Sequence, residues 1–190
     1  MRDIELQRAL RETGKSFFTI ADLEKVTGLG RESLHVYLNR LWKRGAIERA
    51  ARGVYVLPGS GISIERVAGQ LYFPCYLSFE SALSRSGVLN LVPYALTFAT
   101  TRKTRSVELL GRLVEYRRIK EELFFGFDLE DGYYIAKQEK AFLDLVYLAA
   151  FGKASLPLQE LDVSKLSLPV LMEFSRRYPA RVVNKLEGLL

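Results

Sequence analysis

The chain has 190 residues, 48% of them hydrophobic and 12% aromatic, which suffices for the core of one large domain or two small ones and excludes a disordered chain. A net charge of +6 and a pI near 9.4 favour an anionic partner, although many basic proteins never contact nucleic acid. The single cysteine, the lack of a secretion-signal pattern and the lack of an apolar run of about 20 residues predict a cytoplasmic protein without a membrane span.

Two short helices are predicted at the start of the chain. The first runs from Arg2 to Glu12 and ends at Thr13-Gly14. Its expected buried side consists of Ile4, Leu6 and Leu10. Thr19 is placed to cap the second helix, Ile20 to Val26, and Asp22 lies in its first turn, where a carboxylate suits the free N–H groups and the helix dipole.

A third helix follows the break at Gly28-Leu29-Gly30 and is predicted from Arg31 to Arg44. Its apolar stripe, expected to face the core, consists of Leu34, Leu38, Leu41 and Gly45, flanked by Tyr37 and Trp42. The opposite side carries Glu32, Ser33, Val36, Asn39, Arg40 and Lys43. Most of these side chains can pair with base edges or phosphates, and Val36 can touch a thymine methyl, so the pattern is typical of a recognition helix.

Two short strands joined by a turn at Arg52-Gly53 are predicted between Ala46 and Leu57, and we interpret them as a β-wing. From Arg31 to Arg52 the sequence holds six cations and two acids. The excess lies on the two elements that would approach a phosphate backbone, so we predict a winged helix-turn-helix that binds DNA. Its candidate DNA-binding residues are Arg31, Ser33, Val36, Asn39, Arg40, Lys43, Arg49 and Arg52.

The clearest break in composition is Pro58-Gly59-Ser60-Gly61, directly after the second wing strand. We place the domain boundary there. Residues 1–58 are predicted to form the DNA-binding domain, and residues 62–190 a second domain.

The second domain is predicted to begin with a helix from Ser63 to Tyr72, then a helix capped by Ser78 that stops at Gly87. Runs of β-branched and aromatic residues then predict strands at Tyr94–Thr100, Val107–Leu110, Leu113–Ile119, Leu123–Phe127 and Tyr133–Ile135. A largely apolar helix, Lys137 to Phe151, is expected at the centre. After a connection at Leu156–Ser167, two final helices are predicted through Tyr178 and from Ala180 to Leu190.

The predicted fold class is therefore α+β: an N-terminal winged helix-turn-helix, then an α+β domain with a mostly antiparallel sheet and C-terminal helices. Three features together resemble one family: the N-terminal winged helix, Tyr76 to Leu83 with Ser86 to Leu89, and Ile135 to Asp144. The chain resembles an AbiEi-type antitoxin or a transcriptional regulator of that family. The resemblance implies an antitoxin of a type IV toxin-antitoxin system, which represses its own promoter and counters a co-encoded nucleotidyltransferase-like toxin.

Catalysis is a weaker alternative. Glu80, Glu139 and Asp144 can be considered as a carboxylate cluster that holds a metal for phosphoryl chemistry. However, Glu80 follows a predicted cap, Glu139 lies in the first turn of its helix, and Asp144 is placed to pair with Lys140 or to bond to a neighbouring backbone group. We therefore expect no catalytic site and no enzyme. His35 is the single histidine and is read as a flanking or phosphate-contacting residue, so no metal site and no cofactor are expected.

Three further segments carry open alternatives. The turn Arg102-Lys103-Thr104-Arg105 is either a second phosphate-binding site, through Arg102, Lys103 and Arg105, or an ordinary charged turn. The first turn Lys137 to Lys140 is either a partner surface or a solvated face. Cys75 is either a small buried hydrophobe or a nucleophile, and we expect the first, since the sequence has no second histidine to activate it.

Two hypotheses other than the antitoxin-regulator remain. The chain can be a stand-alone winged-helix regulator whose C-terminal domain mediates protein interaction or oligomerisation, such as a homodimer. It can also be an interaction protein whose main activity is to neutralise a partner, with DNA binding secondary.

Overall fold

The computed structural model describes residues 3–189, and its internal contacts divide the chain into two compact units. Unit 1 comprises the residues up to Val67 together with Glu108–Gly111, and unit 2 comprises Ala68–Val107 and the residues from Arg112 onward. The boundary predicted at residues 58–61 precedes this division, which falls within helix α4 (Ile64–Leu71).

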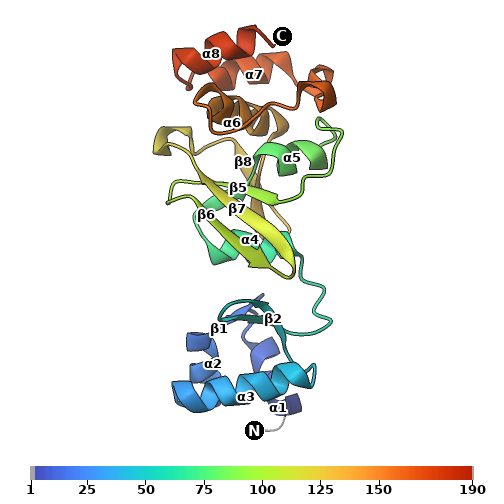
Figure 1. Cartoon of the computed structure of the whole chain (residues 1–190), viewed down its shortest axis with the longest axis vertical. Helices are drawn as coiled ribbons and strands as arrows, with labels where there is room; N and C mark the ends of the chain where they lie inside the picture. Colours follow the sequence, from blue (N-terminus) through green and yellow to red (C-terminus); the bar gives the residue numbers. More distant parts are fainter. Residues whose placement is uncertain (1–2, 190) are drawn as a thin grey trace. The chain divides into compact units, whose positions relative to one another are not determined.

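Unit 1 is built from helices packed on a small sheet (Figure 1). Its elements before α4 are α1 (Asp3–Glu12), β1 (Phe18–Thr19), α2 (Ile20–Thr27), α3 (Arg31–Lys43), β2 (Glu48–Ala51) and β3 (Val54–Val56). The strand order is β1-β3-β2, and β1 pairs antiparallel with β3. The sequence did not predict β1, because a strand of two residues carries no periodicity of its own.

The core of unit 1 is made of leucines from all three of these helices: Leu6, Leu10, Leu23, Leu34, Leu38 and Leu41. The prediction that Ile4 is buried is wrong, because its side chain is 73% exposed. Two residues correspond to about 200° around a helix, so Ile4 points away from the side that buries Leu6. The predicted start of this helix at Arg2 lies outside the described residues.

The cap predicted at Thr19 is confirmed. Its hydroxyl accepts a hydrogen bond from the backbone N–H of Asp22 at 3.3 Å, and the Asp22 carboxylate accepts one from the backbone N–H of Thr19 at 2.9 Å. This reciprocal pair is a capping box, which satisfies two N–H groups that a helix start leaves free. At the other end, Gly28 adopts φ 69°, the left-handed conformation that ends α2.

Unit 2 is a six-stranded sheet with α4 on one face and the other helices on the opposite face (Figure 1). After α4 its elements are β4 (Cys75–Leu77), α5 (Phe79–Arg85), β5 (Leu96–Thr100), β6 (Arg105–Leu109), β7 (Arg112–Arg118), η1 (Glu121–Leu123), β8 (Phe127–Glu130), β9 (Tyr133–Ala136), α6 (Gln138–Ala150), η2 (Leu158–Glu160), η3 (Val163–Lys165), α7 (Leu168–Ser175) and α8 (Ala180–Glu187). The α+β fold class is confirmed.

The sheet of unit 2 is mixed rather than mostly antiparallel. Its order is β6-β7-β5-β4-β9-β8. β4 pairs with β9, and β5 with β7, in parallel, whereas β4 with β5 and β8 with β9 are antiparallel. The residues of a strand do not specify which strand will lie beside it, so the sequence pattern could not give these directions.

One predicted strand is wrong and one strand was missed. Residues 121–123 form the 3₁₀ turn η1, and the strand β8 begins only at Phe127. The aromatic residues that suggested a strand instead pack around Tyr76, whose ring centroid lies 5.1 Å from that of Phe124 and 4.5 Å from that of Phe127. The missed strand is β4, which has only three residues.

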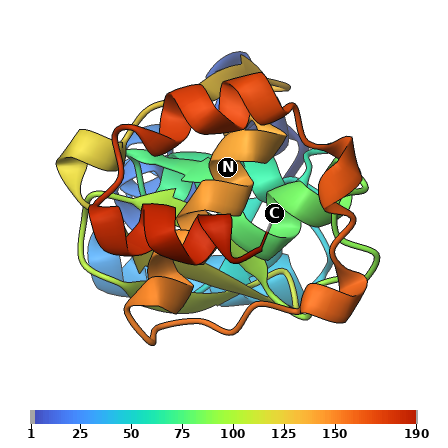
Figure 2. The ribbon, with the colours of Figure 1, turned by 90° about the horizontal axis from the view of Figure 1, so that it is seen from above.

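Helix α6 lies at the centre of unit 2, as predicted. Every residue from Glu139 to Leu148 is buried, and α6 contacts α5, α7 and α8. Figure 2 shows α7 and α8 lying over α6. Across the described chain, no helix combines the length and apolar character needed to cross a bilayer.

Candidate functional site

A cleft of about 640 Å³ lies in unit 1 between α3 and the β2–β3 hairpin. Four of the predicted DNA-binding residues line it: Arg31, Asn39, Arg49 and Arg52. The first two come from the helix and the last two from the hairpin, so the fold brings together residues up to 21 positions apart in sequence.

The helix contributes to the cleft through one row of side chains. Arg31, His35, Asn39 and Trp42 follow one another at spacings of four, four and three residues, which places them on the same side of α3. The other predicted residues of the helix, Ser33, Val36, Arg40 and Lys43, form a neighbouring exposed row outside the cleft lining. The eight predicted residues therefore divide equally between the cleft and the exposed surface.

The hairpin presents its two arginines beside an irregular turn. Gly53 has φ 75°, a conformation that glycine adopts without strain. The register shifts between Arg49 and Ala51, so one residue is inserted opposite β3. Such a bulge bends the strand and changes the direction of its side chains. Arg49 and Arg52 are both exposed, while Ala50 between them is buried.

The cations of this surface have no carboxylate partner within residues 3–189. They are Arg31, Arg40, Lys43, Arg49 and Arg52. Elsewhere in unit 1 several cations are paired: Arg8 with Glu12, Lys15 with Asp22 and Arg44 with Asp3. A row of unpaired, hydrated cations is the arrangement that attracts a polyanion and releases its counterions.

Trp42 was expected beside the buried stripe, and the structure corrects this. Its side chain is 49% exposed and lines the cleft. Leu34, Leu38 and Leu41 fill the core side, and Trp42 lies three residues after Asn39, on the cleft side. The helical spacing from Arg31 could have identified Trp42, but its hydrophobic character suggested the core.

In the basic turn predicted as a second phosphate site, two of the three cations already make contacts within unit 2. The Arg102 guanidinium lies 4.2 Å from the ring centroid of Tyr72 and donates to the backbone oxygen of Phe73 at 3.2 Å. Arg105 lies 5.5 Å from the same ring. The Lys103 ammonium has no bond to any part of the chain that the structure describes.

The three carboxylates considered as a metal cluster lie in separate bonding environments. Glu80 binds Arg117, and Glu139 accepts the backbone N–H of Ser167 at 2.8 Å. Asp144 pairs with Lys140, as predicted from their spacing. In residues 3–189 no group of three His, Cys, Asp or Glu side chains is arranged to hold a metal.

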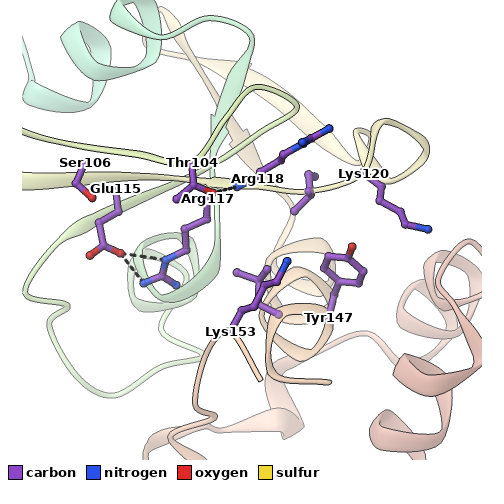
Figure 3. A pocket seen from close by; sticks show the side chains of 10 residues that line it. Thr104, Ser106, Glu115, Arg117, Arg118, Lys120, Tyr147 and Lys153 are labelled. Carbon is purple, nitrogen blue, oxygen red and sulfur yellow. Dashed lines mark hydrogen bonds and ion pairs between the residues drawn. The ribbon is translucent and has the colours of Figure 1, made fainter. Parts of the chain in front are cut away.

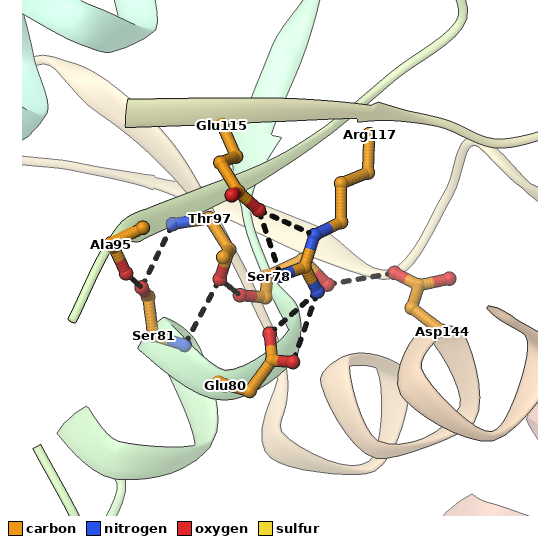
Figure 4. Close-up of polar contacts among 8 residues, drawn as sticks. All are labelled: Ser78, Glu80, Ser81, Ala95, Thr97, Glu115, Arg117 and Asp144. Carbon is orange, nitrogen blue, oxygen red and sulfur yellow. Dashed lines mark hydrogen bonds and ion pairs between the residues drawn. The ribbon is translucent and has the colours of Figure 1, made fainter. Parts of the chain in front are cut away.

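The two chain segments in unit 2 on which the family resemblance depends form a common buried network. Figure 4 shows one of its bonds, between Ser78 and Asp144. The Asp144 carboxylate accepts hydrogen bonds from Tyr76, Ser78 and Tyr178, each at 2.8 Å. Lys140 donates to both tyrosine hydroxyls at 2.8 Å. Every polar group of this network thus has a partner, as a buried network requires.

Two predictions about these segments are corrected. Ser78 occupies the cap position of α5, but its hydroxyl donates to Asp144 and makes no cap hydrogen bond. The turn at residues 137–140 is a solvated face only in its first half, because Lys137 is exposed and Gln138 partly exposed, whereas Lys140 is 0% exposed and Glu139 is also buried. Burial lowers the pKa of Lys140 although Asp144 acts to raise it, so desolvation outweighs the attraction of the carboxylate.

The same two segments also line a cavity of about 430 Å³. Ala82, Arg85 and Ser86 lie on one wall, and Lys137 and Gln138 on another. The edge strand β8 supplies acidic side chains to the same cavity. The segments therefore have two parts, one buried in the network and one accessible from solvent.

Cys75 is buried, as predicted. Burial raises the pKa of its thiol to about 12. The thiol therefore stays protonated at neutral pH, which excludes the thiolate that a nucleophilic cysteine needs.

Residues 5–58 match the model of a family described as transcriptional regulators of the AbiEi antitoxin type. The resemblance predicted from the sequence is confirmed for this segment, which includes α3 and the β2–β3 hairpin. The matched family is one of regulators rather than enzymes.

The fold of the chain is similar to that of a solved protein. It matches the crystal structure of the RV2827C protein from Mycobacterium tuberculosis with a TM-score of 0.65 over 97% of this chain and 74% of that chain. The sequences are 16% identical, so the likeness shows a shared fold alone. A comparison with curated proteins finds no match.

Proposed function

We propose that the chain is a DNA-binding transcriptional repressor whose unit 1 is a winged helix-turn-helix. In this proposal α3 enters the major groove of double-stranded DNA, and the β2–β3 wing contacts an adjacent phosphate backbone. The observation that carries it is the cleft that joins Arg31 and Asn39 of α3 to Arg49 and Arg52 of the wing, with none of these arginines paired within the described residues. The family match over residues 5–58 supports the same assignment.

The roles of the candidate residues follow from their positions. Arg31 and Asn39 are proposed to read base edges, since an arginine can bind guanine and an asparagine adenine through two hydrogen bonds. Arg49 and Arg52 are proposed to bind phosphates. The outer row, with Ser33, Val36, Arg40 and Lys43, contacts the second wall of the groove and its backbone.

The test is a DNA-binding titration at several salt concentrations with the DNA upstream of the chain's own gene. The double substitution Arg49→Gln with Arg52→Gln should weaken binding and reduce the salt slope by about one unit for each lost phosphate contact. Arg8→Gln with Arg11→Gln is the matched control, because it also removes two charges and both are exposed arginines of α1 outside the cleft. If the control loses as much DNA affinity as the cleft variant, the effect comes from net charge alone and the assignment is overturned.

We propose further that the chain is the antitoxin of a type IV system and counters a co-encoded nucleotidyltransferase-like toxin. Support comes from the family description and from the solvent-accessible cavity lined by the two resemblance segments. The Arg49→Gln/Arg52→Gln variant should still restore growth when co-expressed with the neighbouring gene product. If wild-type chain gives no rescue, a stand-alone regulator is the better description, with unit 2 mediating protein interaction or homodimer formation.

A further inference from the structure

A further cavity, of about 760 Å³, lies wholly within unit 2, between β7 and the C-terminal end of α6 (Figure 3). Its polar lining includes Thr104, Ser106, Arg118, Lys120, Tyr147 and Lys153. Cavities that bind small ligands typically measure about 300–1,000 Å³ and carry a few polar groups on an apolar floor. Here Ile119 and Leu148 supply apolar surface.

One wall of this cavity is fixed by Arg117. Its guanidinium donates to both oxygens of Glu80, at 2.8 and 3.0 Å, and to a single oxygen of Glu115, at 2.9 and 3.1 Å (Figure 4). The ring of Phe79 lies 5.3 Å away. Because Arg117 uses only Oε2 of Glu115, the other oxygen of that carboxylate can accept a hydrogen bond from a ligand.

The opposite wall presents a hydroxyl without a partner. Tyr147 is only 8% exposed, and its ring packs against Phe151 and Tyr178, with centroids 5.2 and 6.2 Å away. Its hydroxyl forms no hydrogen bond with any residue that the structure describes. Figure 3 shows Tyr147 and Lys153 extending from the end of α6 toward β7. A phenol held by its ring, with its hydroxyl open to a cavity, is arranged to bond to something that enters there.

The charge of the lining favours an anion. Four cations line the cavity, Arg117, Arg118, Lys120 and Lys153, but Arg117 is held between the carboxylates of Glu80 and Glu115. Within residues 3–189, Arg118 and Lys153 have no carboxylate partner, and Lys120 binds Glu122 at the exposed surface. Thr104 accepts the backbone N–H of Arg118 at 3.2 Å, so its hydroxyl hydrogen remains available to donate. Cations and hydroxyl donors together suit phosphate oxygens.

We propose that this cavity binds a nucleoside triphosphate. The phosphates lie on Lys153 and the Tyr147 hydroxyl, and an amino or hydroxyl donor of the nucleoside bonds to the free oxygen of Glu115. This site is separate from the DNA-binding cleft and does not depend on it. It gives the protein a small-molecule ligand in addition to DNA.

Isothermal titration calorimetry of the full chain with ATP tests the proposal. Saturable binding is expected. Lys153→Gln should weaken it about tenfold, as expected for the loss of one charge-assisted hydrogen bond. Tyr147→Phe, which keeps the buried ring, should weaken it about threefold, as expected for a neutral hydrogen bond. Lys185→Gln is the control, since Lys185 is an exposed lysine of α8 outside the cavity lining, and it should leave the affinity unchanged.

The contrary outcomes are distinct. Absence of saturable binding, or binding that survives both Lys153→Gln and Tyr147→Phe, overturns the site. If inorganic triphosphate binds as tightly as ATP, the nucleoside adds no affinity, and its proposed contact with Glu115 is overturned. If duplex DNA displaces ATP from the wild-type protein, and Lys153→Gln lowers the affinity for that DNA, the surface is a DNA-binding surface instead. Circular dichroism spectra that match wild type show that each variant is folded.

Discussion

Unit 1 leaves the cations of its cleft in water, whereas unit 2 encloses a lysine in its core. Arg31, Arg49 and Arg52 are exposed and have no carboxylate partner within the described residues. Lys140 is completely buried and bonded to Asp144 and two tyrosines. The same kind of charge thus has opposite roles. Exposed and unpaired, it is available to a ligand; buried and bonded, it fixes the packing of the helices around it.

The difference predicts which substitutions affect folding and which affect binding. Trp42, the single tryptophan, reports on unit 1 by fluorescence, and amide hydrogen exchange in α6 reports on unit 2. The two units can therefore be followed separately in one protein.

The largest expected effect on stability is that of Asp144→Asn. This change keeps the shape of the side chain but leaves the Lys140 ammonium buried without a counter-ion, which should lower the free energy of unfolding by about 3–5 kcal/mol. Faster hydrogen exchange in α6 would show it. Adding Lys140→Met should recover part of the loss, because the uncompensated charge is then gone. A change below about 1 kcal/mol in Asp144→Asn would contradict the importance of this pair.

A smaller effect is expected at the capping box of α2. Thr19→Ala removes one reciprocal hydrogen bond and should cost about 1 kcal/mol, measured by denaturant unfolding followed at Trp42. Unchanged unfolding in this variant would show that the cap is dispensable.

The same capping box should make stability depend on pH. Partial burial acts to raise the pKa of Asp22, but its bonds with Lys15 and Thr19 outweigh this and lower the pKa below the ordinary 3.8. The stabilisation by Asp22 is therefore present above pH 3.8 and is lost as the pH falls through the lowered folded-state pKa. The stability difference between wild type and Asp22→Asn should shrink over that range. A difference that persists in acid would contradict the role of its charge.

The cleft arginines should have almost no effect on stability. Arg49→Gln with Arg52→Gln should change the free energy of unfolding by less than about 0.5 kcal/mol, since both side chains are exposed and make no ion pair in the described chain. The same protein is expected to lose DNA affinity. Unfolding of unit 1 at markedly lower denaturant would show instead that these arginines support the hairpin.

The smallest effect concerns Cys75. With a thiol pKa of about 12, the native protein at pH 8 should not react with a thiol-specific reagent, and it should react with one equivalent after denaturation. Rapid labelling of the native chain would show that the strand β4 opens.

The sequence predicted unit 1 in more detail than unit 2. Its helices, the Thr19 cap and the hairpin turn depend on contacts between residues close in the chain, which local patterns report directly. The exceptions are Ile4 and Trp42, for which hydrophobic character gave the wrong side of the helix. In unit 2 the central helix was found, but β4 was missed and β8 misplaced, because three- and four-residue strands carry weak patterns.

The candidate sites show the same limit. The sequence identified the cations of α3 and the β2–β3 hairpin, but not which of them share a cleft. It gave no signal for the cavity beside Tyr147, whose walls come from residues 104–120 and 147–153. It also could not distinguish a solvated Lys140 from a buried one, since spacing alone suits both.

By itself the sequence determined the α+β class, the Thr19 cap, the basic character of α3 and the β2–β3 hairpin, and the resemblance confirmed over residues 5–58. These follow from the composition and periodicity of single segments. The tertiary structure decided the mixed strand directions, the burial of Lys140 and the fixed position of Arg117 between Glu80 and Glu115. Each of these depends on residues far apart in the chain, which only the packing of the sheet and helices brings together.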